Sequence, residues 1–508
     1  MRIIIVKKSN KILPIEDINV KILQKLNEHA TAYVTGVLTY DAYFEYLEST
    51  TSETEFVIDY IETADNSTQL TLFVGLCKKM RNISRDPIGK TEILVEIELI
   101  SYSYLMDIKK VNRSFQDKEM LYGALLAVVN SDEGSSLYGN AAEGIKTGQF
   151  ILQYNETNWD FAKRLASRLN EPLICDYSRN IPGYKFGFSN PVDRGEVESY
   201  DYSISRNISD FMVSSQNDYI QFVSEIDFTR FQIITEGSDP IIYNVGDSIT
   251  YQGEALYISE VEAEMKNFSF STLYKLNTRI GLKQNPLYNS EMRGISLLGK
   301  VIDVSENKLK LHLIDIDKSQ SIDSAYWFRY ATFYSTFYCM PEKGDIVNLH
   351  FPSRDESKAV AINSVKKDPE SGLSRDSSMV SESNTGNDGS SSSQGSGRQP
   401  PVDFASMANN QQVKMLSNDS GKTVVLSDSS IIIQCNDGTF ITLTDGIGID
   451  IITADNITVN SVGKISLMSK DTIAIEATNK IEIKSDGSFI KLDPAVIEVR
   501  ASDIKMNN

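Results

Sequence analysis

The sequence predicts a mainly β protein, an α+β hub followed by a β spike. The predicted parts are two β-barrel hub domains with an α/β insert between them, an OB-fold barrel and a C-terminal trimeric β-helix. Three observations support this prediction. Apolar and polar residues alternate in two long segments. Apolar residues at helical spacing separate these segments, and the C-terminal part repeats one strand-length unit.

The first 290 residues divide by the period of their apolar residues. Alternation in Phe56–Ile61 is typical of a strand with one buried face, and it returns in the Gly-punctuated stretch Val245–Met265. Residues 118–129 and 158–169 have apolar side chains at helical spacing instead. We therefore expect a first hub barrel, an α/β insert and a second hub barrel, at residues 1–110, 111–199 and 200–290.

The following stretch predicts a small barrel and then a linker. Five or six short strands within about 70 residues are typical of an oligonucleotide/oligosaccharide-binding (OB) barrel, which we place at residues 291–365. Residues 366–412 read as a Ser/Gly-rich linker, because Ser383–Gly397 contains no apolar side chain and cannot form a core. The remaining residues, 413–508, are assigned to the spike.

The spike assignment depends on an eight-residue repeat. Each unit has two apolar residues separated by one residue and then five mostly polar positions, which predicts one short strand per unit. A coil formed by one chain needs roughly 20 residues, so eight-residue units fit three chains wound around a shared axis. The alternative is an edge-to-edge β-meander with no special role. The residues predicted to line the trimer axis are Ile449, Ile451, Ile457, Val459, Ile465, Leu467, Ile473, Ile475, Ile481 and Ile483.

Composition restricts the function classes. The 508 residues carry a net charge of -19, which argues against a general electrostatic surface for nucleic acid. The four cysteines are far apart and form no CxxC motif, so neither a disulfide framework nor a zinc site is indicated. The N-terminal apolar run is too short for a signal peptide, and no apolar stretch of 18 residues occurs. We expect synthesis in the cytoplasm without a signal peptide.

A first motif lies in Gly148–Asp176, where a strand leads into a helix that Thr157 should cap and Pro172 should end. Its sequence, Tyr-Asn-Glu-Thr-Asn-Trp-Asp-Phe, closely resembles the phage late control protein D signature. VgrG proteins of type VI secretion and hub proteins of contractile tails share this signature. The residues that carry the resemblance are Tyr154, Asn155, Glu156, Trp159 and Phe161.

A second motif, in Cys339–Val365, resembles the end of the OB barrel in the same family. The matching residues are Met340, Pro341, Gly344 and Asp345. Their chemistry is structural: proline fixes φ at the entry to a turn, and the Gly-Asp pair suits turn geometry before a strand.

The resemblance implies a hub-spike protein of a contractile injection system or phage-tail-like particle. Such a homotrimer would join an Hcp-like tail-tube ring and baseplate proteins to a membrane-puncturing spike, with a PAAR-like tip protein and effector cargo, and would reach the target envelope on firing. The alternative is a receptor-binding or polysaccharide-degrading trimeric tailspike. After Val413 the only aromatic residues are Phe440 and Phe489, which disfavours sugar binding.

We predict no enzyme activity, no cofactor and no metal site. Some spikes of this family carry a lysozyme after the OB barrel, but residues 366–412 leave no room for one. The three histidines fall in different predicted domains or distant strands, and no HExxH, GxSxG or P-loop occurs. Glu156 and Asp160 could be read as an acid and a base, but near a helix N-terminus carboxylates more often offset the helix dipole.

The end of the spike predicts a docking site for a cap. A prism that ends here exposes strand edges, and no histidine is available to close it around a metal as related spikes do. The alternative is that Lys505–Asn508 folds over the end. The residues predicted to dock a PAAR-like cap are Ile497, Val499, Ile504 and Met506.

Overall fold

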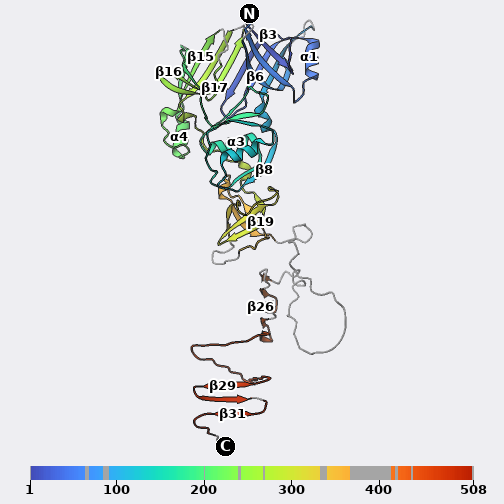
Figure 1. Cartoon of the computed structure of the whole chain (residues 1–508), viewed down its shortest axis with the longest axis vertical. Coiled ribbons are helices and arrows are strands. Elements are labelled where there is room, and N and C mark those ends of the chain that lie inside the picture. The colour runs from blue at the N-terminus through green and yellow to red at the C-terminus, as the bar shows by residue number, and fades with distance from the viewer. Residues whose placement is uncertain are drawn as a thin grey trace. The chain divides into compact units, whose positions relative to one another are not determined.

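The chain separates into two compact units, Met1–Ser383 and Asn384–Asn508, which are described individually. Figure 1 shows the computed structural model, coloured from the N-terminus to the C-terminus. The structure describes residues 2–62, 68–83, 91–199, 201–237, 242–266, 269–331, 340–365, 414–417, 422–435, 439–492 and 494–505. Residues 366–412, predicted as a linker, lie outside the described residues.

A sheet of thirteen strands dominates the first unit (Figure 1). Eleven of its strands follow the order β14-β15-β18-β17-β3-β4-β7-β6-β5-β1-β2, and β13 and β16 join it beside β17. The strands are β1 (Arg2–Lys8), β2 (Lys11–Ile12), β3 (Glu16–Lys25), β4 (Thr31–Thr39), β5 (Glu55–Glu62), β6 (Thr68–Asn82), β7 (Glu92–Ser101), β13 (Asp193–Glu196), β14 (Asp201–Arg206), β15 (Thr229–Gly237), β16 (Ser248–Tyr251), β17 (Glu254–Lys266) and β18 (Ser269–Asn277).

The two predicted hub domains share one sheet in the described residues. Strands from both predicted domains pair directly, with Val20 of β3 opposite Met265 of β17 and Lys25 opposite Glu260. The alternating apolar residues do face inward, and they form one core under β1 and β3 to β7 and another under β15 to β18. The two predicted domains therefore share one continuous sheet, and the first core also includes Ala263, Met265 and Phe270 of the second predicted domain. Helices α1 (Tyr40–Glu48) and α4 (Ile208–Gln216) and the 3-10 turns η2 (Glu225–Phe228) and η3 (Ile280–Leu282) complete this region.

The predicted insert forms a compact α/β core of its own. The two helical patterns become α2 (Tyr122–Asn130) and α3 (Asn158–Ser167), close to the predicted ranges. Burial of their apolar faces, including Leu125, Trp159 and Leu165, drives the packing. The other elements are η1 (Tyr102–Asp107), β8 (Lys110–Phe115), β9 (Ser136–Asn140), β10 (Ile151–Thr157), β11 (Leu173–Cys175) and β12 (Gly183–Phe186).

Five strands after residue 295 close into a small barrel, β19-β20-β21-β23-β22. This closed barrel lies within the range predicted for the OB fold, and leucine and phenylalanine side chains fill it. Its elements are β19 (Ser296–Ser305), β20 (Lys308–Leu313), β21 (Trp327–Ala331), β22 (Ile346–His350) and β23 (Val360–Ser364), with η4 (Ser290–Met292) before it and η5 (Glu356–Lys358) between the last two strands.

The second unit contains two antiparallel sheets, each with its strands in sequence order. Hairpins of this kind correspond to the alternative meander, in which neighbouring strands of one chain pair. Residues 453–480 are described and form no strand within the chain. The strands are β24 (Lys414–Ser417), β25 (Thr423–Leu426), β26 (Ser430–Gln434), β27 (Phe440–Thr444), β28 (Gly448–Ile452), β29 (Ile481–Ser485), β30 (Ser488–Leu492) and β31 (Ile497–Arg500).

Candidate functional site

Strand β10 and the residue before it belong to two cores at once. Side chains alternate across a strand, so Phe150 and Leu152 point into the barrel core while Ile151 points into the insert core. The ring of Phe150 lies 4.9 Å from that of Phe328, in an edge-to-face arrangement. The first motif therefore joins the insert to the barrel.

The chain turns from strand to helix through a bulge and a cap. The register of β10 against β8 shifts between Gln153 and Glu156, and Asn155 in the bulge has φ 47°, which asparagine tolerates better than most residues. The Thr157 hydroxyl accepts a 3.1 Å hydrogen bond from the Asp160 backbone N–H, so the predicted N-cap is confirmed. This geometry directs Glu156 inward, where it is buried.

A buried ion-pair network lies under this turn. The Arg164 guanidinium, 2% exposed, donates to Glu156 Oε2 at 2.8 Å and to Glu356 Oε1 at 2.8 Å. It also donates to the Leu152 carbonyl at 2.7 Å, and Arg168 pairs with Glu356 from the side. Arg164 and Glu156 belong to the insert and Glu356 belongs to the barrel, so charges as well as rings join the two parts.

The two carboxylates have different electrostatic environments. Burial raises the pKa of Glu156, and the hydrogen bond from Arg164 offsets this only in part. Burial acts in the same direction on Glu356, but Arg164 and Arg168 outweigh it and lower the pKa of that carboxyl. Burial also acts against the charge of Arg164, yet Glu356 and Glu156 together raise its pKa. Glu356 is thus the carboxylate that the fold holds most firmly in its charged form.

The other residues of the first motif have packing roles. Trp159 is buried, with its ring 4.3 Å from the His29 ring, and Phe161 stacks on Phe115 at 5.9 Å. The Tyr154 carbonyl accepts from the Asn289 side chain at 2.7 Å, next to the barrel. Asn155 is exposed, and its backbone N–H donates to the Asn112 side chain at 2.7 Å.

The second motif forms a turn at the rim of the barrel. Gly344 has φ 95°, a conformation that favours glycine, and its N–H donates to the Val301 carbonyl at 2.8 Å. The Asp345 carboxylate accepts from the Glu342 backbone N–H at 2.9 Å. Pro341 is buried, and Met340 packs against the barrel core. The turn places Ile346 at the start of β22.

The predicted axis residues have apolar side chains in contact with solvent. Val459 is 69% exposed and Leu467 is 72% exposed. All the residues of this set are exposed in the single chain except Ile481, which is half-buried. Of the predicted tip residues, Ile497, Val499 and Ile504 are also exposed, while Met506 lies outside the described residues.

Glu156 and Asp160 do not form a pair of carboxylates that could act as acid and base. Glu156 binds Arg164, and Asp160 binds Lys163 at 2.7 Å. A different constellation brings Ser103 Oγ within 2.8 Å of His29 Nδ1, with His29 Nε2 3.5 Å from the Asp107 carboxylate. Ser103 is fully buried, so its hydroxyl cannot meet a substrate in this fold. Its Oγ also lies 2.8 Å from the buried Ser101 Oγ, inside the packed interior.

Within the described ranges, no three His, Cys, Asp or Glu side chains come together in a way that could hold a metal ion. No helix described there has the length and apolar character needed to cross a bilayer.

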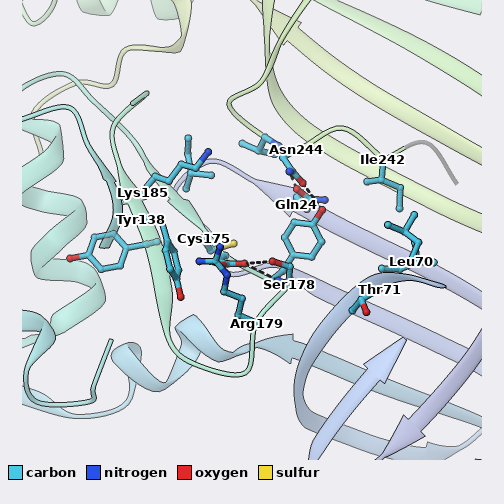
Figure 2. Close-up of a pocket in the computed structure, with 16 residues that line it drawn as sticks. Gln24, Leu70, Thr71, Tyr138, Cys175, Ser178, Arg179, Lys185, Ile242 and Asn244 are labelled. Carbon is cyan, nitrogen blue, oxygen red and sulfur yellow. Dashed lines mark hydrogen bonds and ion pairs between the residues drawn. The ribbon is translucent and has the colours of Figure 1, made fainter. Parts of the chain in front are cut away.

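A hollow of about 360 Å³ lies between β6, the β11–β12 region and residues 242–245. Figure 2 shows Tyr138 and Lys185 on one side of it and Leu70 and Ile242 on the other. Arg179 lies over the Tyr138 ring at 3.8 Å. Burial raises the pKa of the Cys175 thiol to about 12.

Sequence reasoning missed Arg164, Arg168 and Glu356. One signal was available, because Arg164 is a charge three residues after Phe161 on the apolar side of a predicted helix. Nothing local marked Glu356, which follows Arg164 by 192 residues.

The comparisons with known proteins concern the fold. No protein-family model and no curated protein matches the sequence. Among solved structures, a chain of the half-lidded Francisella PdpA-VgrG complex matches 89% of this chain and 87% of its own length, with TM-score 0.53 and 12% identity. A chain of the lidless PdpA-VgrG complex matches 88% of this chain and 97% of its own length, with TM-score 0.51 and 12% identity.

A third match is the E. coli c3393 protein, described as a component of the type VI secretion system with structural similarity to the T4 bacteriophage tail proteins gp27 and gp5. It covers 71% of this chain and 99% of its own, with TM-score 0.49 and 11% identity. The first two matches suffice for the fold. They confirm at that level the resemblance inferred from the two motifs: this chain has a VgrG-like fold.

Proposed function

We propose that this chain is the structural hub-spike of a contractile injection system or phage-tail-like particle. Three copies would associate. The thirteen-stranded sheet would contact an Hcp-like tube ring and baseplate proteins, and the C-terminal repeats would form a spike that enters the target envelope. The role is mechanical, with no catalytic step. The fold shared with chains of the PdpA-VgrG complex supports the hub part of the proposal.

The observation that carries the spike part is the exposed apolar repeat. Residues 453–480 form no strand in the chain, yet they keep two apolar side chains in every eight residues. Exposed Ile457, Leu467 and Ile473 gain free energy only when another surface covers them, and their backbone groups need hydrogen-bond partners. A chain with the same eight-residue spacing supplies both. Three chains close such a structure without a free edge along its length.

Light scattering of the isolated full-length protein tests the association. We expect the mass of a trimer at micromolar concentration. An Ile473→Asp variant should lose the trimer, because it places three carboxylates around one point of an apolar axis, each costing several kcal/mol. Thr472→Asp adds the same charge at the neighbouring position, which alternation directs outward, and should leave the mass unchanged.

A monomeric wild-type protein would disprove the proposal. Equal behaviour of the two aspartate variants would show that the Ile473 side chain does not lie on the axis. The tailspike alternative makes a different prediction, since it requires binding or cleavage of a surface polysaccharide by the purified protein. The exposed side chains of residues 453–480 include no aromatic ring that could stack on a sugar.

The last strands support a cap at the tip. Exposed Ile497, Val499 and Ile504 would leave an apolar end open in a trimeric prism, and a PAAR-like cone would cover it. Removal of the last 12 residues should abolish co-purification of a small protein at one copy per trimer from the native particle. A bare, ordered tip in the intact particle would instead favour closure by Lys505–Asn508.

A further inference from the structure

The hollow beside β6 lies where three segments of the first unit meet. Gln24 of β3 and residues 70–72 of β6 come from the sheet, residues 174–185 come from the insert, and residues 242–245 come from the connection before β16. Its volume of about 360 Å³ falls in the range of pockets for small organic ligands. Leu70 and Arg179 are exposed, so the hollow is open to solvent.

Gln24 presents a buried donor to this hollow. It is 3% exposed, and its Oε1 accepts from the Val245 backbone N–H at 3.4 Å. That contact leaves Nε2 as the donor, which forms no hydrogen bond of normal geometry within the described part of the chain. The neighbouring Tyr177 hydroxyl donates to Asn244 Oδ1 at 2.5 Å. Buried polar groups rarely stay unpaired, so Gln24 indicates an acceptor atom of a ligand. Figure 2 shows Gln24 and Asn244 between the two sides of the hollow.

The charges that line the hollow favour an anion. They are Asp176, Arg179 and Lys185. The Asp176 carboxylate accepts from the N–H and the hydroxyl of Ser178, each at 2.8 Å, and lies 3.4 Å from the Arg179 guanidinium. A cationic ligand would therefore find its only carboxylate already bonded. Lys185 has no hydrogen bond or ion pair with the described residues, so one positive charge remains without a counterion.

Apolar side chains line much of the remaining surface of the hollow. Figure 2 shows two of them, Leu70 and Ile242, across from Lys185. An aliphatic group placed there would remove these side chains from water, which is favourable in proportion to the area covered. A sugar would instead place hydroxyl groups against this wall. The apolar residues are Leu70, Leu72, Ile174, Ile242 and Val245.

We propose that this hollow binds a small aliphatic carboxylate. The carboxylate pairs with Lys185, an oxygen of the ligand accepts from Gln24, and the aliphatic group covers Leu70 and Ile242. Two sources share this chemistry, a free organic acid and the C-terminal residue of a peptide. The proposal goes beyond the mechanical role and does not depend on the trimer.

Titration calorimetry of the full-length protein with N-acetylleucine tests the charge. We expect binding, with N-acetylleucinamide weaker on the order of 10-fold because it lacks the carboxylate. Lys185→Met should weaken N-acetylleucine by a similar factor and leave the amide unchanged. Lys163→Met removes an equal charge from α3, outside the hollow, and should bind as the wild type does. Unfolding midpoints without ligand check that each variant folds.

A second variant tests the apolar wall. Leu70→Asn changes an exposed side chain, so the fold should tolerate it. It should weaken N-acetylleucine several-fold and leave N-acetylglycine, which has no aliphatic side chain, unchanged. The probe 4-methylpentanoate distinguishes the two sources, since it keeps the carboxylate and the aliphatic group without the amide. Equal affinity for both probes supports a free acid, and a preference for N-acetylleucine that Gln24→Met abolishes supports a peptide terminus.

Three results would overturn the proposal. Absence of binding by both N-acetylleucine and 4-methylpentanoate would show that the hollow does not take this class of ligand. Equal affinity for N-acetylleucine and its amide would show that no carboxylate is recognised. Binding that neither Lys185→Met nor Leu70→Asn weakens would place the ligand elsewhere on the chain.

Discussion

Arg164 lies 2% exposed between two carboxylates of its own chain, whereas Leu467 in the C-terminal unit is 72% exposed. Both residues depart from the ordinary rule that charges lie outside and large apolar groups inside. In the first case the compensation is present, because Glu156 and Glu356 neutralise the guanidinium. In the second case the described residues of the chain do not cover the apolar side chain.

The difference separates information used for folding from information used for assembly. At the insert–barrel junction, each buried polar or charged group described above meets a partner encoded elsewhere in the same sequence. In residues 453–480 the repeating apolar pairs form no strand in their own chain. In the proposed trimer, these exposed apolar residues form the surface that the other copies cover.

The most damaging change should be Arg164→Ala. It leaves Glu156 and Glu356 buried without their shared cation, and we expect a loss of about 3–5 kcal/mol in the free energy of unfolding of the first unit. Urea unfolding measures this loss. Lys163→Ala removes only the neighbouring surface pair with Asp160 and should cost less than about 1 kcal/mol. Similar losses in both variants would show that the network is not what joins the barrel to the insert.

Leu467→Ala should act on the assembly and leave the fold of the single chain intact. In the proposed trimer it removes buried apolar volume, and we expect a loss of about 3 kcal/mol per chain. Thermal unfolding over a range of protein concentrations measures it, since the loss should appear as easier dissociation on dilution. Ser466→Ala, one position away, is the control. An unchanged dissociation midpoint for Leu467→Ala would place this side chain in solvent.

The two carboxylates of the junction should differ in cost and in pH dependence. Glu356→Gln should cost about 2 kcal/mol, because it removes a carboxylate that two arginines hold ionised, and Glu156→Gln should cost about 1 kcal/mol. The pKa of Glu356 lies below the unfolded value of about 4.3, so its stabilising contribution is present at higher pH and is lost as pH falls. The pKa of Glu156 is raised, so this carboxyl opposes folding at higher pH, and the opposition is relieved as pH falls.

Unfolding free energies measured between pH 6 and 3 should reveal these signs. The wild-type protein should lose stability on acidification, Glu356→Gln should lose less, and Glu156→Gln should lose more because the opposing carboxyl is gone. Parallel pH profiles for the two variants would contradict the assignment of Glu356 as the charged partner.

Local features were predictable from the sequence, and long-range ones were not. The spacing of apolar and capping residues predicted a strand, a cap at Thr157 and a helix within a few residues of their observed positions. The pairing of β3 with β17 joins segments about 240 residues apart, and no local pattern specifies which strand edges meet. The ion pair of Arg164 with Glu356 has the same cause, since each residue is ordinary in its own segment.

In the second unit, turn residues between strands carry information about which strands pair within the chain. Strands pair within the chain where a turn can form, as at Asp486 and Gly487 between Ser485 and Ser488, with Gly487 at φ 86°. Gly446, at φ 71°, lies in the turn between β27 and β28. Residues 453–480 contain a single glycine, Gly463. Glycine therefore marks some of the hairpins, although the connection between β25 and β26, residues 427–429, contains none.

The double role of β10 sets a boundary for recombination between related genes. Because Phe150 and Leu152 fill the barrel and Arg164 neutralises Glu356, a barrel taken from another protein would have to bring matching residues for the insert. A chimera joined between residues 280 and 295 would separate these partners. A junction placed after residue 365 leaves all of them together. The C-terminal unit can then be exchanged between related proteins without separating the insert from its barrel.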